Sequence, residues 1–420
     1  MSPVEIIHNF EGASLGESQI QANAIFASIH EEPLVKKDGI LHDYNWHFVF
    51  GVKNNSNTEK QIKIFINCKS KEQLDTRANI LGTHKLDSEF HPLDNIDAYT
   101  DTYKKYAIEI SLSGKETCYL SNTYFRNLNL IKKRIESLDT QNSFIKENYG
   151  KSLEGRELEA YLFAEKDISQ NQKPNIVVTS GFHPMEGDTL ATEALMEFLG
   201  TEEGTDLLNR FNFIIIPVVN PDGFAHGFNG CNAKGINLYW DFREKDKKNA
   251  PEAFYLWAFL NKIPPSVYID FHAYTFQLHR KKASSYIKPT YLYRGTEVRD
   301  VVEFINRELI SYHDGHFMEG PLTFTPSALP YKLTDKFNTL TYAKYHLHIK
   351  DGKDALKKSA VDIVKKITYN LISHDFCDQG KILSVPYGNV RGNIRDYFKK
   401  KINVFWTFRL KVFLKKILGK

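Results

Sequence analysis

Short, almost uninterrupted apolar runs in the second half of the chain constrain its fold most strongly. They read NIVVT at 175–179, FNFIIIPVV at 211–219 and SVYIDF at 266–271, and a fourth run is predicted at 338–342. Stretches with helical periodicity fall between and after them, at 188–199, 253–260 and 355–372. Buried strands that alternate with amphipathic helices are typical of an α/β sheet covered on both faces. We therefore predict an α/β domain in this part of the chain.

The first 130 or so residues follow a different pattern. Apolar and polar side chains alternate at 46–52, 62–68 and 106–112, and turns rich in Asn, Ser and Gly separate these runs. A period of two bounded by turns indicates half-buried antiparallel strands. We predict an antiparallel β-sandwich over residues 1–130. A helical period takes over at 124–149, which predicts a linker helix.

The C-terminal segment carries the positive charge of the chain. Seven Lys, two Arg and one Asp between Ile394 and Lys420 give +8, so the other residues carry −4 of the total of +4. The body is mildly acidic, and we expect no nucleic-acid binding. The chain therefore divides into the sandwich at 1–130, the α/β domain at 131–375 and a basic tail at 376–420. The tail fits either a terminal element packed on the body or an amphipathic helix in peripheral contact with an anionic membrane.

Composition places the chain in a broad class. Its 420 residues are 42% hydrophobic and 25% charged, as in ordinary globular proteins. The N-terminus lacks the basic and apolar regions of a secretory signal, and no run approaches the roughly 18 apolar residues of a membrane helix. The four cysteines lie far apart without a CxxC pair, which favours free thiols in a reducing compartment. We expect a cytoplasmic protein, and the sequence indicates no particular oligomeric state.

Two histidines and a glutamate are placed to meet at one edge of the predicted sheet. His183 comes soon after the first buried strand, and Glu186 follows three residues later at the entry to a helix. His272 ends another apolar strand and can approach from the neighbouring strand end. Two imidazoles and a carboxylate that leave an open position are the ligands that catalytic zinc prefers. Asp270, on the same strand face as His272, either orients an imidazole from outside the ligand set or caps a turn.

The order of several motifs resembles the M14 zinc carboxypeptidase family, and particularly its cytosolic carboxypeptidase branch. These motifs are GKSLEGR at 150–156, the HPME pair at 183–186, NPDG at 220–223, GINLYW at 235–240 and the Asp-Phe-His sequence at 270–272. The resemblance implies a mixed α/β sheet covered by helices behind a β-sandwich. It also implies one zinc ion per chain on His183, Glu186 and His272, and hydrolysis of a peptide or another amide-bearing small substrate by a metal-activated water.

Several positions depart from the family's pattern. The Asn and Arg with which the family grips the substrate's terminal carboxylate fall on Tyr239 and Trp240, and an Arg that polarises the scissile carbonyl falls on Gly230. The glutamate that serves as general base falls on Ala343, or on Thr341 in a shifted register. An indole does not replace a guanidinium fork, and a methyl group does not replace a basic carboxylate. Tyr239 and Trp240 instead indicate a substrate pocket rebuilt with aromatic groups, suited to an apolar or sugar-like moiety.

Three explanations of these departures stay open. Other side chains can serve in place of the missing ones, although each is more often a solvated surface residue. They are Glu319, Asp335, His346 and His348 as base, Arg243, Arg280 and Lys344 as cation, and the cluster 279–282 as a contact for an anionic substrate. The chain can also hold zinc and bind a ligand without turnover. An engineered loss of the base at Ala343 would leave the other changes unexplained.

The sequence therefore predicts an atypical M14-like metallohydrolase with an altered substrate pocket and an unidentified general base. The alternative from a different class is a catalytically silent, zinc-holding binding protein on the same scaffold. A small-acyl amidohydrolase of the aspartoacylase type also carries the HxxE pair and a distant His. The β-sandwich and the NPDG segment argue against that third hypothesis.

Overall fold

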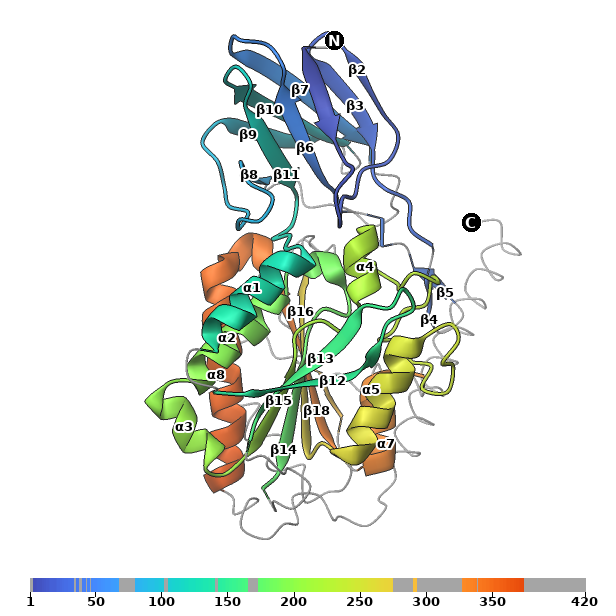
Figure 1. The fold of residues 1–420 in the computed structure, drawn as a ribbon, viewed down its shortest axis with the longest axis vertical. Helices are drawn as coiled ribbons and strands as arrows, with labels where there is room; N and C mark the ends of the chain where they lie inside the picture. The colour runs from blue at the N-terminus through green and yellow to red at the C-terminus, as the bar shows by residue number, and fades with distance from the viewer. Residues whose placement is uncertain are drawn as a thin grey trace, which may run out of the picture.

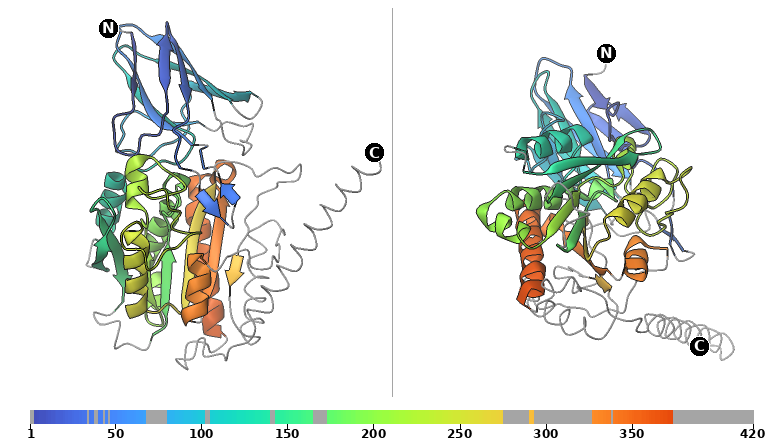
Figure 2. Two further views of the ribbon diagram at one scale, coloured as in Figure 1. Left: turned by 90° about the vertical axis from the view of Figure 1, so that its right-hand side faces the viewer. Right: turned by 60° about the horizontal axis from the view of Figure 1, so that its bottom comes forward.

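The computed structural model describes residues 3–33, 35–37, 40–42, 44–45, 47–67, 80–101, 105–139, 143–164, 173–274, 290–292, 327–337 and 339–373. These residues form a β-sandwich that is stacked on one end of a larger α/β domain (Figure 1; Figure 2). A β-rich N-terminal region followed by an α/β sheet is the order that the sequence predicts. Within the described part of the chain, no helix has the length and apolar character needed to cross a bilayer.

Two sheets make the sandwich, with strand orders β1-β6-β11-β8 and β2-β3-β7-β10-β9. Their strands are β1 (Val4–Ile7), β2 (Ser18–Gln21), β3 (Ala24–Ser28), β6 (Val49–Asn54), β7 (Lys60–Asn67), β8 (Leu81–Thr83), β9 (Ile96–Asp101), β10 (Lys105–Leu112) and β11 (Thr117–Ser121), and a separate pair joins β4 (Val35–Lys37) to β5 (Ile40–His42). Alternate residues of β7, Ile62, Ile64 and Ile66, lie in the core that the two sheets share. The prediction of antiparallel pairing is wrong for one pair, because β3 and β7 run parallel. The chain crosses through β6 in the other sheet between them, and such a crossover permits parallel pairing.

One short helix connects the sandwich to the second domain. α1 (Leu128–Leu138) begins after Asn127, whose side-chain Oδ1 accepts the Leu130 N–H at 2.7 Å. The prediction of a helix over 124–149 is wrong beyond Leu138, because the chain turns into strand β12 (Ile145–Lys151). β12 lies at the edge of its sheet with half-exposed and exposed side chains, so its sequence lacks the apolar alternation of an inner strand.

A seven-stranded mixed sheet, in the order β12-β13-β15-β14-β16-β18-β17, forms the centre of the second domain. Its other strands are β13 (Glu157–Phe163), β14 (Asn175–Thr179), β15 (Asn212–Ile216), β16 (Val267–Tyr274), β17 (Thr290–Leu292) and β18 (Leu340–Leu347). β14, β15, β16 and β18 are parallel to one another, whereas β12, β13 and β17 are antiparallel to their neighbours. The four parallel strands are the four apolar runs of the sequence.

Helices cover both faces of this sheet, as predicted (Figure 1). α1, α2 (Thr189–Leu199), α3 (Glu202–Leu208) and α8 (His348–Ser373) lie on one side, α5 (Pro251–Lys262) and α7 (Leu329–Phe337) lie on the other, and α4 (Pro221–His226) lies at the end near the sandwich. Ile176 and Val178 of β14 pack into the core shared with α2 and α8, while Val177 packs into the core shared with α5. Apolar side chains on both faces explain why this strand reads as a continuous hydrophobic run.

The sandwich packs closely against the end of the α/β domain that carries α4. The Gly12 N–H donates to Ala225 O at 2.9 Å, and His47 Nε2 lies 2.9 Å from Gly227 O. Gly227 has a φ of +65°, and a Cβ on it would lie 2.4 Å from Ala13 O. Only glycine permits this approach. The contact lies near the carboxyl ends of β14 and β16, where α/β folds place their sites.

Candidate metal centre

Gly181 lets the chain turn sharply between β14 and the first predicted ligand. Its φ is +67°, and a Cβ on it would lie 2.6 Å from Pro217 O, so a side chain here would collide with the backbone that follows β15. A single 3₁₀ turn, η1 (Pro184–Glu186), begins after His183. The Glu186 N–H donates to His183 O at 3.0 Å, which closes this turn. The turn places the His183 and Glu186 side chains on the same side of the loop.

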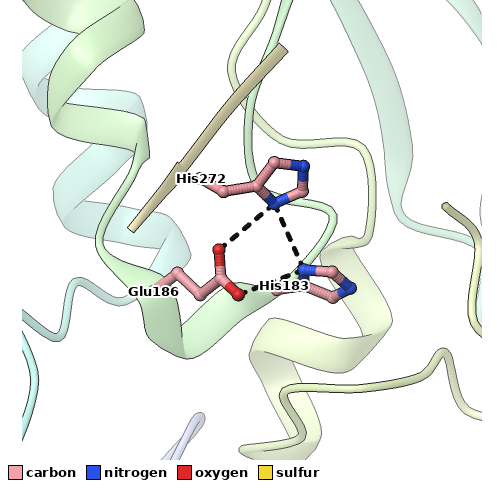
Figure 3. Close-up of side chains that lie close together, drawn as sticks. All are labelled: His183, Glu186 and His272. Atoms are coloured by element: carbon pink, nitrogen blue, oxygen red, sulfur yellow. Dashed lines mark hydrogen bonds and ion pairs between the residues drawn. The ribbon is translucent and has the colours of Figure 1, made fainter. Parts of the chain in front are cut away.

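Ligand atoms from these two residues and from His272 on β16 converge at one point (Figure 3). His183 Nδ1 lies 3.3 Å from His272 Nδ1 and 3.2 Å from Glu186 Oε1. His272 Nδ1 lies 3.2 Å from Glu186 Oε2. All three residues are buried. Within the described ranges, they are the group of His, Cys, Asp and Glu whose atoms lie close enough together to share a metal ion.

The spacing and chemistry of these atoms fit a tetrahedral zinc ion. Zinc bonds of about 2.0–2.1 Å place neighbouring tetrahedral donors about 3.3–3.4 Å apart. Glu186 Oε1 is buried and makes no well-aligned hydrogen bond with the described groups, although His183 Nδ1 lies 3.2 Å away, so a cation would satisfy it. One contact must adapt, because Asn237 Nδ2 lies 3.3 Å from His183 Nε2. Ligation through Nδ1 leaves a hydrogen on Nε2, and this pair of nitrogens must then separate slightly.

Asp270 holds the second imidazole in place. Its Oδ2 lies 2.6 Å from His272 Nε2, and its Oδ1 accepts the Thr179 hydroxyl at 2.7 Å. A hydrogen on His272 Nε2 is therefore donated to Asp270, which turns Nδ1 toward Glu186 as the atom that would bind a metal in place of its proton. Of the two roles that the sequence left open for Asp270, this contact favours the orientation of the imidazole.

Buried charges make the centre favourable for a cation. Burial alone would lower the pKa of His272, but the carboxylates of Asp270 and Glu186 raise it well above its usual range. Burial would conversely raise the pKa of Glu186, but His183 and His272 lower it. Burial and the charge of Glu186 raise the pKa of the nearby Asp188 carboxyl. A divalent ion would replace protons as the positive partner of these carboxylates.

The two aromatic residues predicted for the substrate pocket take different positions. Tyr239 is fully buried, and its ring centroid lies 4.7 Å from that of His272 and 6.2 Å from that of His183. Its ring packs on both imidazoles. Trp240 is half-buried, and its ring lies 4.9 Å from that of Tyr239. Of the pair, only Trp240 keeps an exposed surface for a substrate to contact.

Sequence reasoning missed a segment of the sandwich that reaches the centre. The Tyr44 ring centroid lies 5.4 Å from that of His183, and the planes are tilted by 32°. Burial, together with the charges of Glu186 and Glu32, raises the pKa of the Tyr44 phenol well above its usual range, so its hydroxyl stays protonated. Tyr44 lies just before the alternating run at 46–52, which predicts a strand, and no motif in the sequence marks this position as part of a site.

Comparison with known proteins decides the family. The model of the M14 peptidases, described as zinc carboxypeptidase, matches residues 131–416. The chain belongs to the M14 zinc carboxypeptidase family. Over 112 residues it is 31% identical to the inactive metallocarboxypeptidase ECM14 of Saccharomyces cerevisiae, a match that covers 25% of each chain. Over 111 residues it is 28% identical to cytosolic carboxypeptidase 4 of Mus musculus, covering 24% of this chain and 10% of the mouse protein.

The sequence matches thus span a quarter or less of these relatives, whereas the fold likeness is broader. A metallo-carboxypeptidase from Burkholderia cenocepacia superposes with a TM-score of 0.71 at 13% identity, and the match covers 88% of this chain and 99% of that one. A metallo-carboxypeptidase from Pseudomonas aeruginosa gives a TM-score of 0.65, also at 13% identity, with 88% and 99% covered. Coverage of this extent includes most of the sandwich, so both parts of the fold occur together in those two proteins.

The late strand of this M14 chain has no carboxylate at either position expected for the general base. β18 runs parallel to β16, and its register places Ala343 beside Asp270 and Thr341 beside Tyr268. Thr341 is buried. An alanine has no proton acceptor in its side chain, and a threonine hydroxyl is a poor base at neutral pH.

The other candidate groups give no replacement within the described residues. Arg243 is exposed, and its guanidinium lies 2.7 Å from Asp241. Asp335 is exposed on α7, which lies toward the end of the domain away from the sandwich (Figure 1). Glu319, Arg280, the cluster 279–282 and the side chains of Lys344, His346 and His348 lie outside the described residues, as does the basic tail.

Proposed function

We propose that this chain binds one zinc ion through His183, Glu186 and His272 and hydrolyses an amide bond in a carboxypeptidase-like manner. The observation that supports the proposal is the convergence of three buried ligand atoms at separations of 3.2–3.3 Å. Two nitrogens and one carboxylate oxygen leave a fourth tetrahedral position open for water or substrate. Bound zinc would supply a Lewis acid and a water acidic enough to attack a carbonyl near neutral pH.

The residues of the chain itself would orient the ligands and exclude water. Asp270 fixes the His272 ring through the 2.6 Å contact with Nε2. The Ala273 N–H donates to Glu186 Oε2 at 3.0 Å, which holds the carboxylate against both imidazoles. Tyr239 packs on the same two rings. Such support is what keeps metal ligands preorganised.

We further propose that the substrate differs from that of a typical carboxypeptidase. The positions expected to grip a terminal carboxylate hold Tyr239 and Trp240, and the position expected for a carbonyl-polarising Arg holds Gly230. Peptides or other amides without a free terminal carboxylate near the reacting bond are the better candidates. A half-buried indole at Trp240 suits an apolar or sugar-like group.

A catalytically silent binding protein is the second candidate. Ala343 and Thr341 supply no base, and general-base help is worth about 10²–10⁴ in rate. One of the relatives, from yeast, is named an inactive metallocarboxypeptidase. On this hypothesis the same three residues hold zinc, and the pocket binds a ligand without hydrolysing it.

Cytoplasmic location and membrane contact through the basic tail also stay predictions.

Metal content and activity together test the proposal. The purified chain should contain close to one zinc ion, and chelation should lower its melting temperature. His272→Ala should lose the metal, whereas the matched variant His84→Ala, at an exposed site in the sandwich, should keep it. Turnover of peptides, acylated amino acids and cell-wall fragments is then compared between these chains. A wild type that binds zinc but never exceeds His272→Ala on any substrate would support the silent binding protein instead.

A further inference from the structure

A segment of the sandwich is fastened to the α/β domain beside the metal ligands. Glu32 is buried, and its carboxylate accepts the N–H of Asn229 at 2.8 Å and that of Gly230 at 2.9 Å. The Asn45 side chain bonds the backbone of Glu32 on both sides, since its Oδ1 accepts the Glu32 N–H at 2.6 Å and its Nδ2 donates to Glu32 O at 3.4 Å. Tyr44, the neighbour of Asn45, is thereby delivered to the centre.

The absence of a side chain at Gly230 makes room for Tyr44. A Cβ on Gly230 would lie 2.5 Å from Tyr44 Cδ2 and 2.6 Å from Cγ, closer than any real Cβ contact. The Tyr44 ring packs on the His183 ring from this position. The phenol therefore occupies the space into which any longer side chain at position 230 would extend.

The hydrogen bonds of the Tyr44 hydroxyl determine what its hydrogen can do. The side chains of Trp240 and Asn237 lie within reach of the phenol oxygen, and as hydrogen-bond donors they would by themselves lower the Tyr44 pKa. The indole nitrogen and the amide nitrogen are donors without lone pairs. The orientation of the Asn237 amide is fixed, because its Oδ1 already accepts the N–H of Tyr239 at 3.0 Å and of Trp240 at 2.8 Å. With two donors on its oxygen, the Tyr44 hydroxyl has its own hydrogen left to donate.

We propose that the Tyr44 hydroxyl is the hydrogen-bond donor for the carbonyl oxygen of the reacting amide. This inference rests on the proposed function, because it assumes a metal on His183, Glu186 and His272. The carbonyl oxygen gains negative charge when water attacks the carbon, and a fixed donor in a site with little water stabilises that charge. Three residues then act together. Gly230 makes room for the Tyr44 ring, Trp240 orients the Tyr44 hydroxyl oxygen, and Tyr44 donates the hydrogen bond to the carbonyl oxygen.

Tyr44→Phe tests the donor without removing the ring that packs on His183. The full-length chain is loaded with cobalt(II), whose visible absorption reports on groups entering the open position, and is titrated with inorganic phosphate. A hydrogen bond to a charged oxygen is worth enough that Tyr44→Phe should bind phosphate about 10- to 100-fold more weakly. Tyr149→Phe, which removes a buried hydroxyl without a described hydrogen-bond partner beside Phe259, should match the wild type. Equal cobalt content in the three chains verifies that the centre itself is intact.

The possible outcomes separate this inference from the proposed function. Equal phosphate affinity in the wild type and Tyr44→Phe, at equal cobalt content, would overturn the role of Tyr44 and leave the metal centre standing. An equal loss in Tyr44→Phe and Tyr149→Phe would also overturn it, since the effect would then be one of general stability. A wild-type chain that takes up no cobalt would overturn the proposed function, and this inference with it.

Discussion

Asp270 Oδ2 lies 2.6 Å from His272 Nε2, and this contact decides which nitrogen of the imidazole faces Glu186. Both side chains are fully buried. The Nε2 hydrogen has a fixed acceptor, so Nδ1 is the nitrogen that faces the point where His183 and Glu186 also converge. The carboxylate outside the ligand set therefore fixes the orientation of the imidazole, and a metal that binds to Nδ1 would displace the proton there.

Asp270→Asn should weaken zinc binding about 10- to 100-fold, because an amide orients the imidazole less firmly and lowers its basicity. Competition with a chromogenic chelator measures the dissociation constant. Asp241→Asn, at a half-buried carboxylate that contacts Arg243, is the matched control and should bind zinc like the wild type. An unchanged affinity in Asp270→Asn would show that the contact does not tune the ligand.

Gly230→Ala should destabilise the chain by about 1–3 kcal/mol, because the new methyl group would collide with the Tyr44 ring. The fixed Glu32 contact on the Gly230 N–H prevents the backbone from moving away easily. Urea unfolding measures the loss. Gly200→Ala is a suitable control, because the nearest atom to its Cβ would be 3.4 Å away and its φ is −79°. Similar stability in both variants would mean that Tyr44 does not occupy this space.

Arg126→Met should lower the free energy of unfolding by about 3–5 kcal/mol, because it leaves the buried Glu193 carboxylate without its main partner. The Arg126 side chain is 1% exposed and pairs with Glu193 of α2 and with Glu89 at 3.1 Å. Arg134 and Lys357 also contact Glu193, so the lower part of the range is expected. The exposed Lys132→Met should change the free energy of unfolding little. Equal effects in the two variants would contradict a structural role for the buried pair.

Glu252→Gln should change how stability depends on pH. Burial raises the pKa of Glu252 to about 7, from 4.5 in the unfolded chain. The folded state then holds the proton more tightly, so the free energy of unfolding falls as the pH rises from about 4.5 to about 7. The free energy of unfolding of the wild type should fall by up to about 3 kcal/mol over this pH window, and that of Glu252→Gln should fall less. Urea midpoints at pH 5 and pH 8 provide the comparison, with the exposed Glu136→Gln as control. A slope that is the same in all three chains would exclude Glu252 as its source.

The sequence predicted the parts of the fold in which burial dominates the choice of residues. β14, β15, β16 and β18 are apolar on both faces, and each could be located from its hydrophobic run. The convergence of His183, Glu186 and His272 could be predicted because the first two follow β14 and the third lies near the end of β16. Their exact separation could not, since it depends on a 3₁₀ turn that a left-handed Gly187 terminates.

Other features depend on contacts that local patterns do not encode. β12 is an exposed edge strand whose sequence carries no clear period, and the predicted helix at 124–149 therefore extends wrongly over it. Glu32 and Gly230 are 198 positions apart, and the Glu32 carboxylate accepts a backbone N–H. Nearly every residue has such an N–H, so no residue type in the sequence marks this contact. The position of Tyr44 depends on this long-range contact through its neighbour Asn45, so the sequence does not distinguish Tyr44 from other tyrosines. In the sequence, Gly230 stands out only because an arginine is expected there, whereas in the fold it leaves room for the Tyr44 ring.

The Glu32 carboxylate on the Asn229 and Gly230 amides has a consequence for dissecting this protein. A fragment trimmed to the peptidase homology alone would keep all three ligands yet expose bare amides and an unfilled slot beside one imidazole. Biochemistry on such a fragment would describe a different cavity, with different access for water and small molecules, from that of the intact polypeptide.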